Sequence, residues 1–313
     1  METTHNKGVT DFARQAQAMM CLQAFDALCA KSKGLCHLVP LKGIDLLRTL
    51  YADTLDRELH DIDLLVYPAE KAVDFIALLQ AEGYRPEFSY ALDSAALNTK
   101  KKVSMLAPSE HLPHVDVHIA LVTKKFFAMT LNGFNEDVLT RVQPVDEVVS
   151  ELDKIDRWLF LASHLAFHFL TGDKWYRDLA LLWDRMTEPE KTTLHERAKH
   201  YHLDRVIEAV LFCMQGGEPK SRFLRYVAHV TANPKRLEHG IRPARYYWEF
   251  ILISDDKERR RAYRALLFPS LGNMQNIYRC KAFTAVLLYL PHVLLNSIGL
   301  ILFSIHYAIY SRS

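Results

Sequence analysis

The chain has little that would hold a fold together covalently. Its 313 residues include five cysteines, an odd number scattered along the chain without any C-x-x-C spacing. This pattern argues against a disulfide framework and against a cysteine-based zinc site, and it fits a reducing compartment. The first eleven residues are polar and lack the apolar core of a signal peptide. From these absences we predict a cytoplasmic protein.

Net charge is also low, with 39 Lys and Arg against 37 Asp and Glu. Overall charge therefore gives no sign of nucleic-acid binding, and no stripe of basic residues interleaved with aromatic ones stands out. We accordingly predict that nucleic acid is not a partner. The length is sufficient for one or two domains with a sizeable core.

Charge is distributed unevenly near the C-terminus. Residues 218–281 carry 14 Lys and Arg against 6 Asp and Glu, whereas residues 282–311 carry none of the four. The apolar stretch is long enough to span a bilayer, which needs about 20 residues, but polar residues such as His292 and Asn296 are costly in hydrocarbon. Three interpretations stay open: helices buried against the protein, a helix in the membrane interface, and a span. The last two would make the protein membrane-associated through this tail.

Two segments alternate acidic and apolar residues, Asp61-Ile62-Asp63-Leu64-Leu65-Val66 and Val115-Asp116-Val117-His118-Ile119. Side chains in a strand alternate between two faces, so Asp61 and Asp63 share one face with Cα atoms roughly 6.5–7 Å apart. A neighbouring strand would bring Asp116 to the same place. Because clustered carboxylates repel one another unless a cation neutralises them, the pattern suits two-metal phosphoryl chemistry. On this reasoning, removing any of these carboxylates is expected to abolish activity without harming the fold.

Apolar periodicity and the positions of glycine and proline predict the elements of the fold. Up to about residue 139 they predict helices over 9–31, 44–51 and 69–82 and strands over 36–41, 61–67, 102–106 and 114–121. Beyond that they predict helices over 152–170, 175–185, 188–200, 204–214 and 243–267. This order indicates an α+β protein. We predict a small mixed β-sheet domain over 1–145, an all-helical domain over 146–280 and an apolar helical tail over 281–313.

The order of motifs resembles a known family. The motifs are Leu41-Lys42-Gly43, then Arg57, then Asp61-Ile62-Asp63, then Val115-Asp116-Val117-His118. This order resembles the uncharacterised nucleotidyltransferase family, part of the DNA polymerase β-like nucleotidyltransferase superfamily. The specific likeness covers residues 39–120, and a weaker likeness continues to about residue 278.

The resemblance implies roles for several residues. Asp61 and Asp63 would bind Mg²⁺ or Mn²⁺, Asp116 would be a third metal ligand or the base, and Gly43 would lie at a turn against the nucleotide phosphates. The chain departs from the superfamily in two ways. It has Lys42-Gly43 where Gly-Ser or Gly-Gly is usual, and its gap of 18 residues from Gly43 to Asp61 is longer than the common spacing.

Three further residues are candidates for roles in the site. Arg57 would brace triphosphate oxygens or pair with a neighbouring acidic residue. Lys42 would contact phosphate as a point charge. His118 shares a strand face with Asp116, where it would assist proton transfer, orient a carboxylate or serve as a buried, hydrogen-bonded structural residue.

The leading hypothesis is a Mg²⁺-dependent nucleotidyltransferase that moves a nucleoside monophosphate from a triphosphate to an acceptor hydroxyl. The acceptor stays open among a protein side chain, a small molecule and a membrane-linked sugar. The alternative is a non-catalytic nucleotide sensor or scaffold with the same fold. Hydrolysis of a phosphoester at the same carboxylates is a third possibility.

Overall fold

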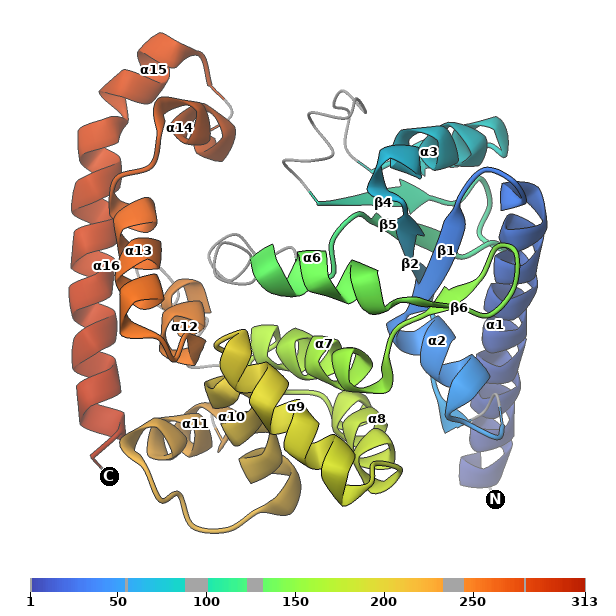
Figure 1. Ribbon diagram of the computed structural model, residues 1–313, viewed down its shortest axis with the longest axis horizontal. Helices are drawn as coiled ribbons and strands as arrows, with labels where there is room; N and C mark the ends of the chain where they lie inside the picture. The colour runs from blue at the N-terminus through green and yellow to red at the C-terminus, as the bar shows by residue number, and fades with distance from the viewer. Residues whose placement is uncertain are drawn as a thin grey trace. The chain divides into compact units, whose positions relative to one another are not determined.

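The computed structural model describes residues 2–53, 56–87, 101–122, 132–232, 245–278 and 280–312. The chain divides into two compact units, here called unit 1 (Met1–Thr123 and Asn135–Arg157) and unit 2 (Lys124–Phe134 and Trp158–Ser313). A five-stranded mixed sheet lies in the N-terminal part, and the C-terminal part is helical (Figure 1). The predicted α+β class is therefore confirmed.

Unit 1 is built around the sheet, whose strand order is β1-β2-β5-β4-β3. Strands β2 and β5 pair in parallel, and the other pairs in the sheet are antiparallel. The strands are β1 (His37–Leu41), β2 (Asp61–Tyr67), β3 (Arg85–Pro86), β4 (Lys102–Leu106) and β5 (His114–His118), with β6 (Gln143–Pro144) and β7 (Ser150–Glu151) as a separate pair. The helices of this part are α1 (Glu2–Ser32), α2 (Lys42–Thr49), the 3₁₀ helix η2 (Ala69–Lys71), α3 (Ala72–Ala81) and α6 (Asn132–Arg141).

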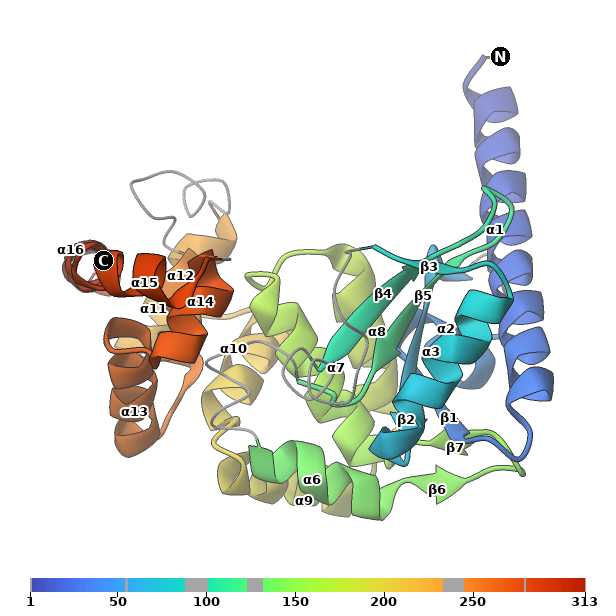
Figure 2. The same ribbon diagram turned by 90° about the horizontal axis from the view of Figure 1, so that it is seen from above.

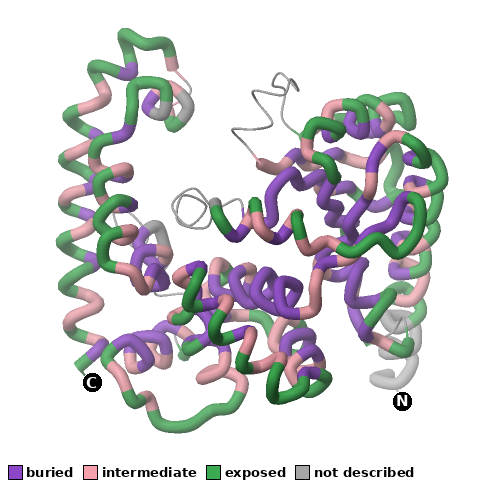
Figure 3. Tube along the Cα trace, in the orientation of Figure 1, coloured by how far each residue is buried: buried purple, intermediate pink, exposed green. Residues whose placement is uncertain are grey.

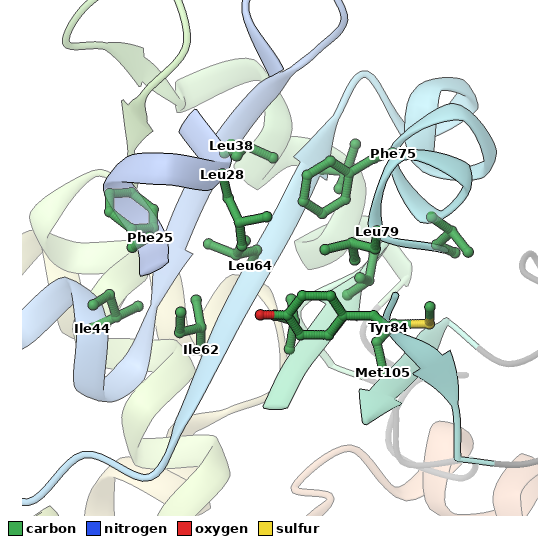
Figure 4. Close-up of a cluster of buried hydrophobic side chains, with 14 of the residues drawn as sticks. Phe25, Leu28, Leu38, Ile44, Ile62, Leu64, Phe75, Leu79, Tyr84 and Met105 are labelled. Atoms are coloured by element: carbon green, nitrogen blue, oxygen red, sulfur yellow. The ribbon is translucent and has the colours of Figure 1, made fainter. Parts of the chain in front are cut away.

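The core of unit 1 lies on one face of the sheet. Ile62 and Leu64 of β2 are fully buried and pack with side chains of α1 and α3, among them Phe25 and Phe75 (Figure 4). Burial of each such side chain contributes about 1.5–3 kcal/mol. Because side chains alternate along a strand, this packing directs Asp61 and Asp63 to the opposite face.

Unit 2 is helical in its described part. Its helices are α7 (Lys154–Phe167), which begins in unit 1, α8 (Asp173–Asp184), α9 (Glu188–His200), α10 (Asp204–Gln215), α11 (Arg222–Ala232), α12 (Arg245–Leu252), α13 (Asp256–Leu267), α14 (Leu271–Tyr278), α15 (Ala282–Leu287) and α16 (Tyr289–Tyr310). The helix predicted over 188–200 has the same bounds in the structure. Its start is fixed by a capping box, in which Thr187 and Glu190 each bond the other's backbone.

Most of the other predicted helices differ from the structure by a few residues at their ends, and two of these differences matter for the fold. The helix predicted over 243–267 is two helices, α12 and α13, and its first two residues lie outside the described part. The break follows from Asp255, whose side chain accepts a hydrogen bond from the backbone N–H of Glu258 (2.7 Å) and starts a new helix. The helix predicted from residue 44 begins at Lys42, which places Gly43 inside the first turn of α2 rather than before it.

A buried ion pair ties α2 to the end of unit 1. The carboxylate of Asp45 is 1% exposed, and its Oδ2 lies 3.0 Å from Nε of Arg157. Arg157 also contacts Thr49 Oγ1 at 3.2 Å and Glu151 Oε2 at 3.4 Å. Burial raises the pKa of Asp45 to about 7, although Arg157 opposes the shift. The folded state therefore holds the proton of this carboxyl more strongly than the unfolded chain does.

Asp45 is expected to make the protein less stable as the pH rises. Because the pKa of Asp45 is higher in the folded state, its contribution to stability is fully present below the ordinary pKa of an aspartate. Between about pH 4 and 7 the free energy of unfolding then falls by no more than about 1.4 kcal/mol per pH unit. The Asp45→Asn variant should lack this slope when urea unfolding is followed from pH 4.5 to 8. Asp74→Asn, on the surface beside Lys71, is the control and should keep it. Equal slopes in wild type and Asp45→Asn would contradict the assignment.

Candidate active site

The sheet register brings the predicted site residues to one face. In the parallel pair β2–β5, Asp63 is the partner of Asp116 and Asp61 is the partner of His114. On the other side of β5, Ser104 of β4 is the partner of Asp116 and Lys102 is the partner of His118. Side chains of register partners point to the same side of a sheet. Three adjacent strands therefore build the polar cluster on the face opposite Ile62 and Leu64.

Asp63 is the most enclosed carboxylate of the cluster, with 4% of its side chain exposed. Its Oδ1 accepts from Nζ of Lys42 at 2.6 Å and lies 2.9 Å from Nε2 of His118. Burial by itself raises the pKa of Asp63, but the hydrogen bond of His118 and the positive charge of Lys42 outweigh it and hold that pKa below its ordinary value. Asp63 is therefore ionised at neutral pH.

His118 is the neutral partner of Asp63. Burial lowers the pKa of His118, with the hydrogen bond to Asp63 acting in the opposite direction. Since an ionised carboxylate can only accept, Nε2 must carry the proton and donate to Asp63. The structure thus shows a buried, hydrogen-bonded histidine that orients a carboxylate, which unites two of the interpretations drawn from the sequence.

Asp116 is held by two donors from β4. Ser104 Oγ donates to Oδ1 at 2.6 Å, and Nζ of Lys102 pairs with Oδ2. The Asp116 side chain is 13% exposed and that of Lys102 is 32% exposed. No motif in the sequence singles out Lys102 or Ser104. Their alternation along the predicted strand over 102–106 places them on one face, but only the pairing of β4 with β5 shows that this face carries Asp116.

Asp61 lies at the start of β2 and is more exposed than the other two carboxylates. Loss of surrounding water raises the pKa of Asp61, and the negative charges of Asp63 and Asp116 raise it further. This repulsion is the one expected when carboxylates cluster.

The group that is closest together differs from the predicted set. Donor atoms of Asp63, Asp116 and His118 lie within 4.8 Å of one another, and Asp61 is not part of this group. Carboxylate oxygens are the ligands that Mg²⁺ and Mn²⁺ prefer. The cluster holds the three carboxylates and the ammonium groups of Lys42 and Lys102, so its formal charge is one negative. The residues present therefore fit a divalent cation, while the metal roles of Asp61, Asp63 and Asp116 stay a prediction.

The turn from β1 into α2 explains the first departure from the superfamily pattern. Lys42 has a φ of +51°, in the left-handed region that costs a non-glycine residue about 1–2 kcal/mol. It occupies the position where the superfamily has its first glycine. Here a lysine adopts the strained backbone conformation, and its ammonium group contacts Asp63. The lysine thus adds a positive charge at a position where glycine would relieve the strain.

Gly43 is needed for close packing. A Cβ atom at this position would lie 2.6 Å from Cδ1 of Leu59, which is 3% exposed and has little room to move. Gly43→Ala is expected to lower the free energy of unfolding by about 1–3 kcal/mol, as overpacking does. The control is Gly133→Ala, where a Cβ would meet no atom within 4 Å, and this change should raise it by up to about 1 kcal/mol. Equal urea midpoints for the two variants would mean that Leu59 moves aside.

Arg57 lies inside the protein rather than in an open loop. It is 6% exposed, and its NH1 donates to the backbone carbonyl of Glu58 at 2.5 Å. A role in binding triphosphate stays a prediction, as do the phosphate contacts of Lys42 and Gly43.

Comparison with known proteins agrees with the geometry. The family model described as "Uncharacterised nucleotidyltransferase" matches residues 10–216. The match covers the whole polar cluster and extends through α10. No curated protein matches the sequence. Because the model covers about two thirds of the chain, the protein belongs to the uncharacterised nucleotidyltransferase family.

Proposed function

We propose that the protein is a Mg²⁺-dependent nucleotidyltransferase whose site is the polar cluster of β2, β4 and β5. Family membership supports nucleotidyl transfer and a nucleoside triphosphate substrate. The observation that carries the proposal is the parallel register of β2 and β5, because it sets Asp63 directly beside Asp116 with donor atoms within 4.8 Å. The acceptor stays open among a protein side chain, a small molecule and a membrane-linked sugar.

The residues of the cluster have distinct proposed roles. Asp61, Asp63 and Asp116 hold Mg²⁺ or Mn²⁺, with Asp116 as the alternative base for the acceptor hydroxyl. The bound cation would neutralise charge on the triphosphate and on the departing pyrophosphate. His118 fixes the orientation of Asp63 through Nε2, as partners of metal ligands commonly do.

The two lysines are proposed to change partners when substrate binds. Lys42 and Lys102 pair with Asp63 and Asp116, and an ammonium group beside a carboxylate competes with a cation for the same oxygen. A triphosphate offers these ammonium groups new anionic oxygens. Lys42 and Lys102 would then pass from the carboxylates to the phosphates, which couples metal binding to nucleotide binding.

The same lysines favour a second candidate function. A nucleotide sensor or scaffold that has lost catalysis would keep its carboxylates neutralised by protein cations, and such a protein need not bind Mg²⁺. The two candidates differ in whether the triphosphate is cleaved.

Pyrophosphate release tests the proposal. The protein is incubated with each of the four nucleoside triphosphates, Mg²⁺ or Mn²⁺ and a cell extract as the source of acceptor, and pyrophosphate is quantified. Metal-dependent release that is lost in Asp116→Asn is the expected result. Pyrophosphate with free nucleoside monophosphate and no acceptor product would indicate hydrolysis. Metal-dependent triphosphate binding without pyrophosphate would indicate the sensor.

A further inference from the structure

The C-terminal helix α16 exposes a continuous apolar stripe. The outer stripe is formed by Leu290, Leu294, Ile298, Ile301, Ile305 and Ile309, which recur every three or four residues and are each 48–66% exposed. Exposed positions recur along the whole helix in Figure 3. Helix α15, directly before α16 in the chain, also exposes Phe283 and Leu287, which are 77% and 62% exposed. An apolar surface of this extent on one element marks an interaction site.

The polar side chains of α16 point the other way. His292 and Asn296 are 2% and 0% exposed. Nε2 of His292 lies 2.8 Å from the carbonyl oxygen of Leu266, and the amide of Asn296 donates to the carbonyl oxygen of His292 at 2.8 Å. Ser304 is exposed, but its hydroxyl donates to the carbonyl oxygen of Leu300 at 2.8 Å. The helix is therefore amphipathic, but its apolar side faces outward while His292 and Asn296 face the protein.

The inner side of α16 is attached to unit 2 along its length. Near the start of the helix, Nδ1 of His292 lies 3.0 Å from the hydroxyl of Tyr278, and near its end His306 lies 3.0 Å from the hydroxyl of Tyr226. At the C-cap, Arg225 donates to the carbonyl oxygen of Ser311 at 2.7 Å. Figure 2 looks along α16 and shows α11, α12 and α13 on one side of it. Spanning a bilayer would require all these contacts to break, although α16 is long and apolar enough to span.

Basic residues flank the apolar stretch in the sequence and are exposed on a helix that packs against α16. Residues 282–311 contain no charged side chain, and exposed Lys281 and Arg312 stand immediately before and after them. Helix α13, which packs against α16, carries exposed Arg260, Arg261 and Arg264, while the acidic residues of α13 stand in its first turn. Each basic residue close to an anionic bilayer surface adds about 1 kcal/mol of attraction. An exposed apolar helix face accompanied by basic residues is typical of a helix that lies in the membrane interface.

We propose that the outer stripe of α15 and α16 binds an anionic lipid bilayer, with α16 lying in the plane of the membrane and its apolar side chains entering the acyl region. A second copy of the chain is a poorer occupant because a two-fold interface would bring the exposed basic residues of one copy toward those of the other. The stripe lies outside residues 10–216 that define the family. Membrane binding is therefore independent of the proposed chemistry.

Vesicle flotation of the full chain tests the proposal. The vesicles are phosphatidylcholine alone or an equal mixture of phosphatidylcholine and phosphatidylglycerol. We expect flotation with the anionic vesicles, at least tenfold weaker binding with the neutral ones, and release by alkaline carbonate as for a helix that does not span. Ile298→Glu/Ile301→Glu should abolish flotation. The matched control is Val145→Glu, a change at a 55% exposed valine of unit 1, which should leave it unchanged.

Three results would overturn the proposal. Flotation that survives Ile298→Glu/Ile301→Glu would place lipid binding elsewhere. Resistance to carbonate would indicate a span. A dimer in light scattering that the double substitution dissociates, with no flotation of wild type, would assign the stripe to a second copy. Circular dichroism of the double variant checks its fold, and if the fold is lost, Ile305→Glu alone and Ile309→Glu alone are to be tested in the same way.

Discussion

Asp63→Asn is expected to abolish transfer and to destabilise the protein, whereas Asp61→Asn is expected to abolish transfer and leave stability unchanged or higher. Loss of a proposed metal ligand removes several kcal/mol of transition-state stabilisation, which is a loss of about 10³-fold or more. Both variants should show it. The two variants are expected to differ in stability because of what each carboxylate contacts. The charge of Asp63 is paired with Lys42 and hydrogen-bonded by His118, whereas the charge of Asp61 is repelled by Asp63 and Asp116.

The sign of each pKa shift predicts this difference. The pKa of Asp63 is lowered in the fold, so its ionised form stabilises the protein above the ordinary pKa, and this contribution is lost as pH falls through the folded-state value. At pH 7.5 its removal is expected to cost about 1.5–3 kcal/mol, as for a hydrogen bond to a charged group. The pKa of Asp61 is raised, so its ionised form opposes folding at pH 7.5. Removing that charge relieves repulsion.

Urea unfolding and transfer assays on the same preparations measure both effects. The sequence alone predicts that every carboxylate is dispensable for folding. We still expect this for Asp61, but not for Asp63, because Asp63 forms an ion pair with Lys42. A midpoint for Asp63→Asn equal to that of wild type at pH 7.5 would show that Lys42 and His118 do not stabilise the carboxylate. A large loss of stability in Asp61→Asn would contradict the repulsion.

Lys42→Met is expected to bind Mn²⁺ about ten- to a hundredfold more tightly than wild type when no nucleotide is present, and to bind triphosphate more weakly. The ammonium group of Lys42 lies 2.6 Å from Oδ1 of Asp63, where it competes with a cation for a carboxylate that is almost fully buried. Such a charged hydrogen bond is worth about 1.5–3 kcal/mol, which sets the size of the gain. Methionine keeps the length of the side chain without its charge, and it retains the strained backbone at this position.

Calorimetry with Mn²⁺ alone, and then with Mn²⁺ and a non-hydrolysable triphosphate, measures the two affinities. The control is Lys33→Met, because Lys33 is exposed and pairs with Glu147 on the surface. It should leave both values unchanged. Weaker Mn²⁺ binding by Lys42→Met would mean that the lysine builds the cation site rather than competing for it. Unchanged triphosphate binding would remove Lys42 from the phosphate contacts.

Local patterns were enough to predict much of unit 1. The alternation of Asp61 to Val66 and of Val115 to Ile119 placed two strands and the faces of their carboxylates, and the structure confirms strands over Asp61–Tyr67 and His114–His118. The start of α9 could be predicted in the same way, since Thr187 and Glu190 form a local capping box there. These features depend on residues within a few positions of one another.

Features that depend on distant pairing were not readable from one sequence. Lys102 and Ser104 reach the cluster only because β4 pairs with β5, and Asp63 meets Asp116 through a register that joins residues 53 positions apart. A lysine by itself gives no sign of the left-handed backbone conformation that Lys42 adopts, although the superfamily has glycine at this position. In the tail, the sequence shows that residues 282–311 are uncharged, but only the packing against the rest of unit 2 shows that His292 and Asn296 face inward.

The most direct test of the site follows one nucleotide with two labels. The protein, Mg²⁺ and cell extract are incubated with triphosphate labelled at the α-phosphate or at the γ-phosphate, beside Asp63→Asn and Lys33→Met. The proposal predicts that α-label enters a protein, lipid or small-molecule fraction, that γ-label leaves as pyrophosphate, and that Asp63→Asn alone loses the transfer. Transfer of γ-label to the acceptor, or α-label transfer that persists in Asp63→Asn, would contradict a nucleotidyltransferase site at these carboxylates.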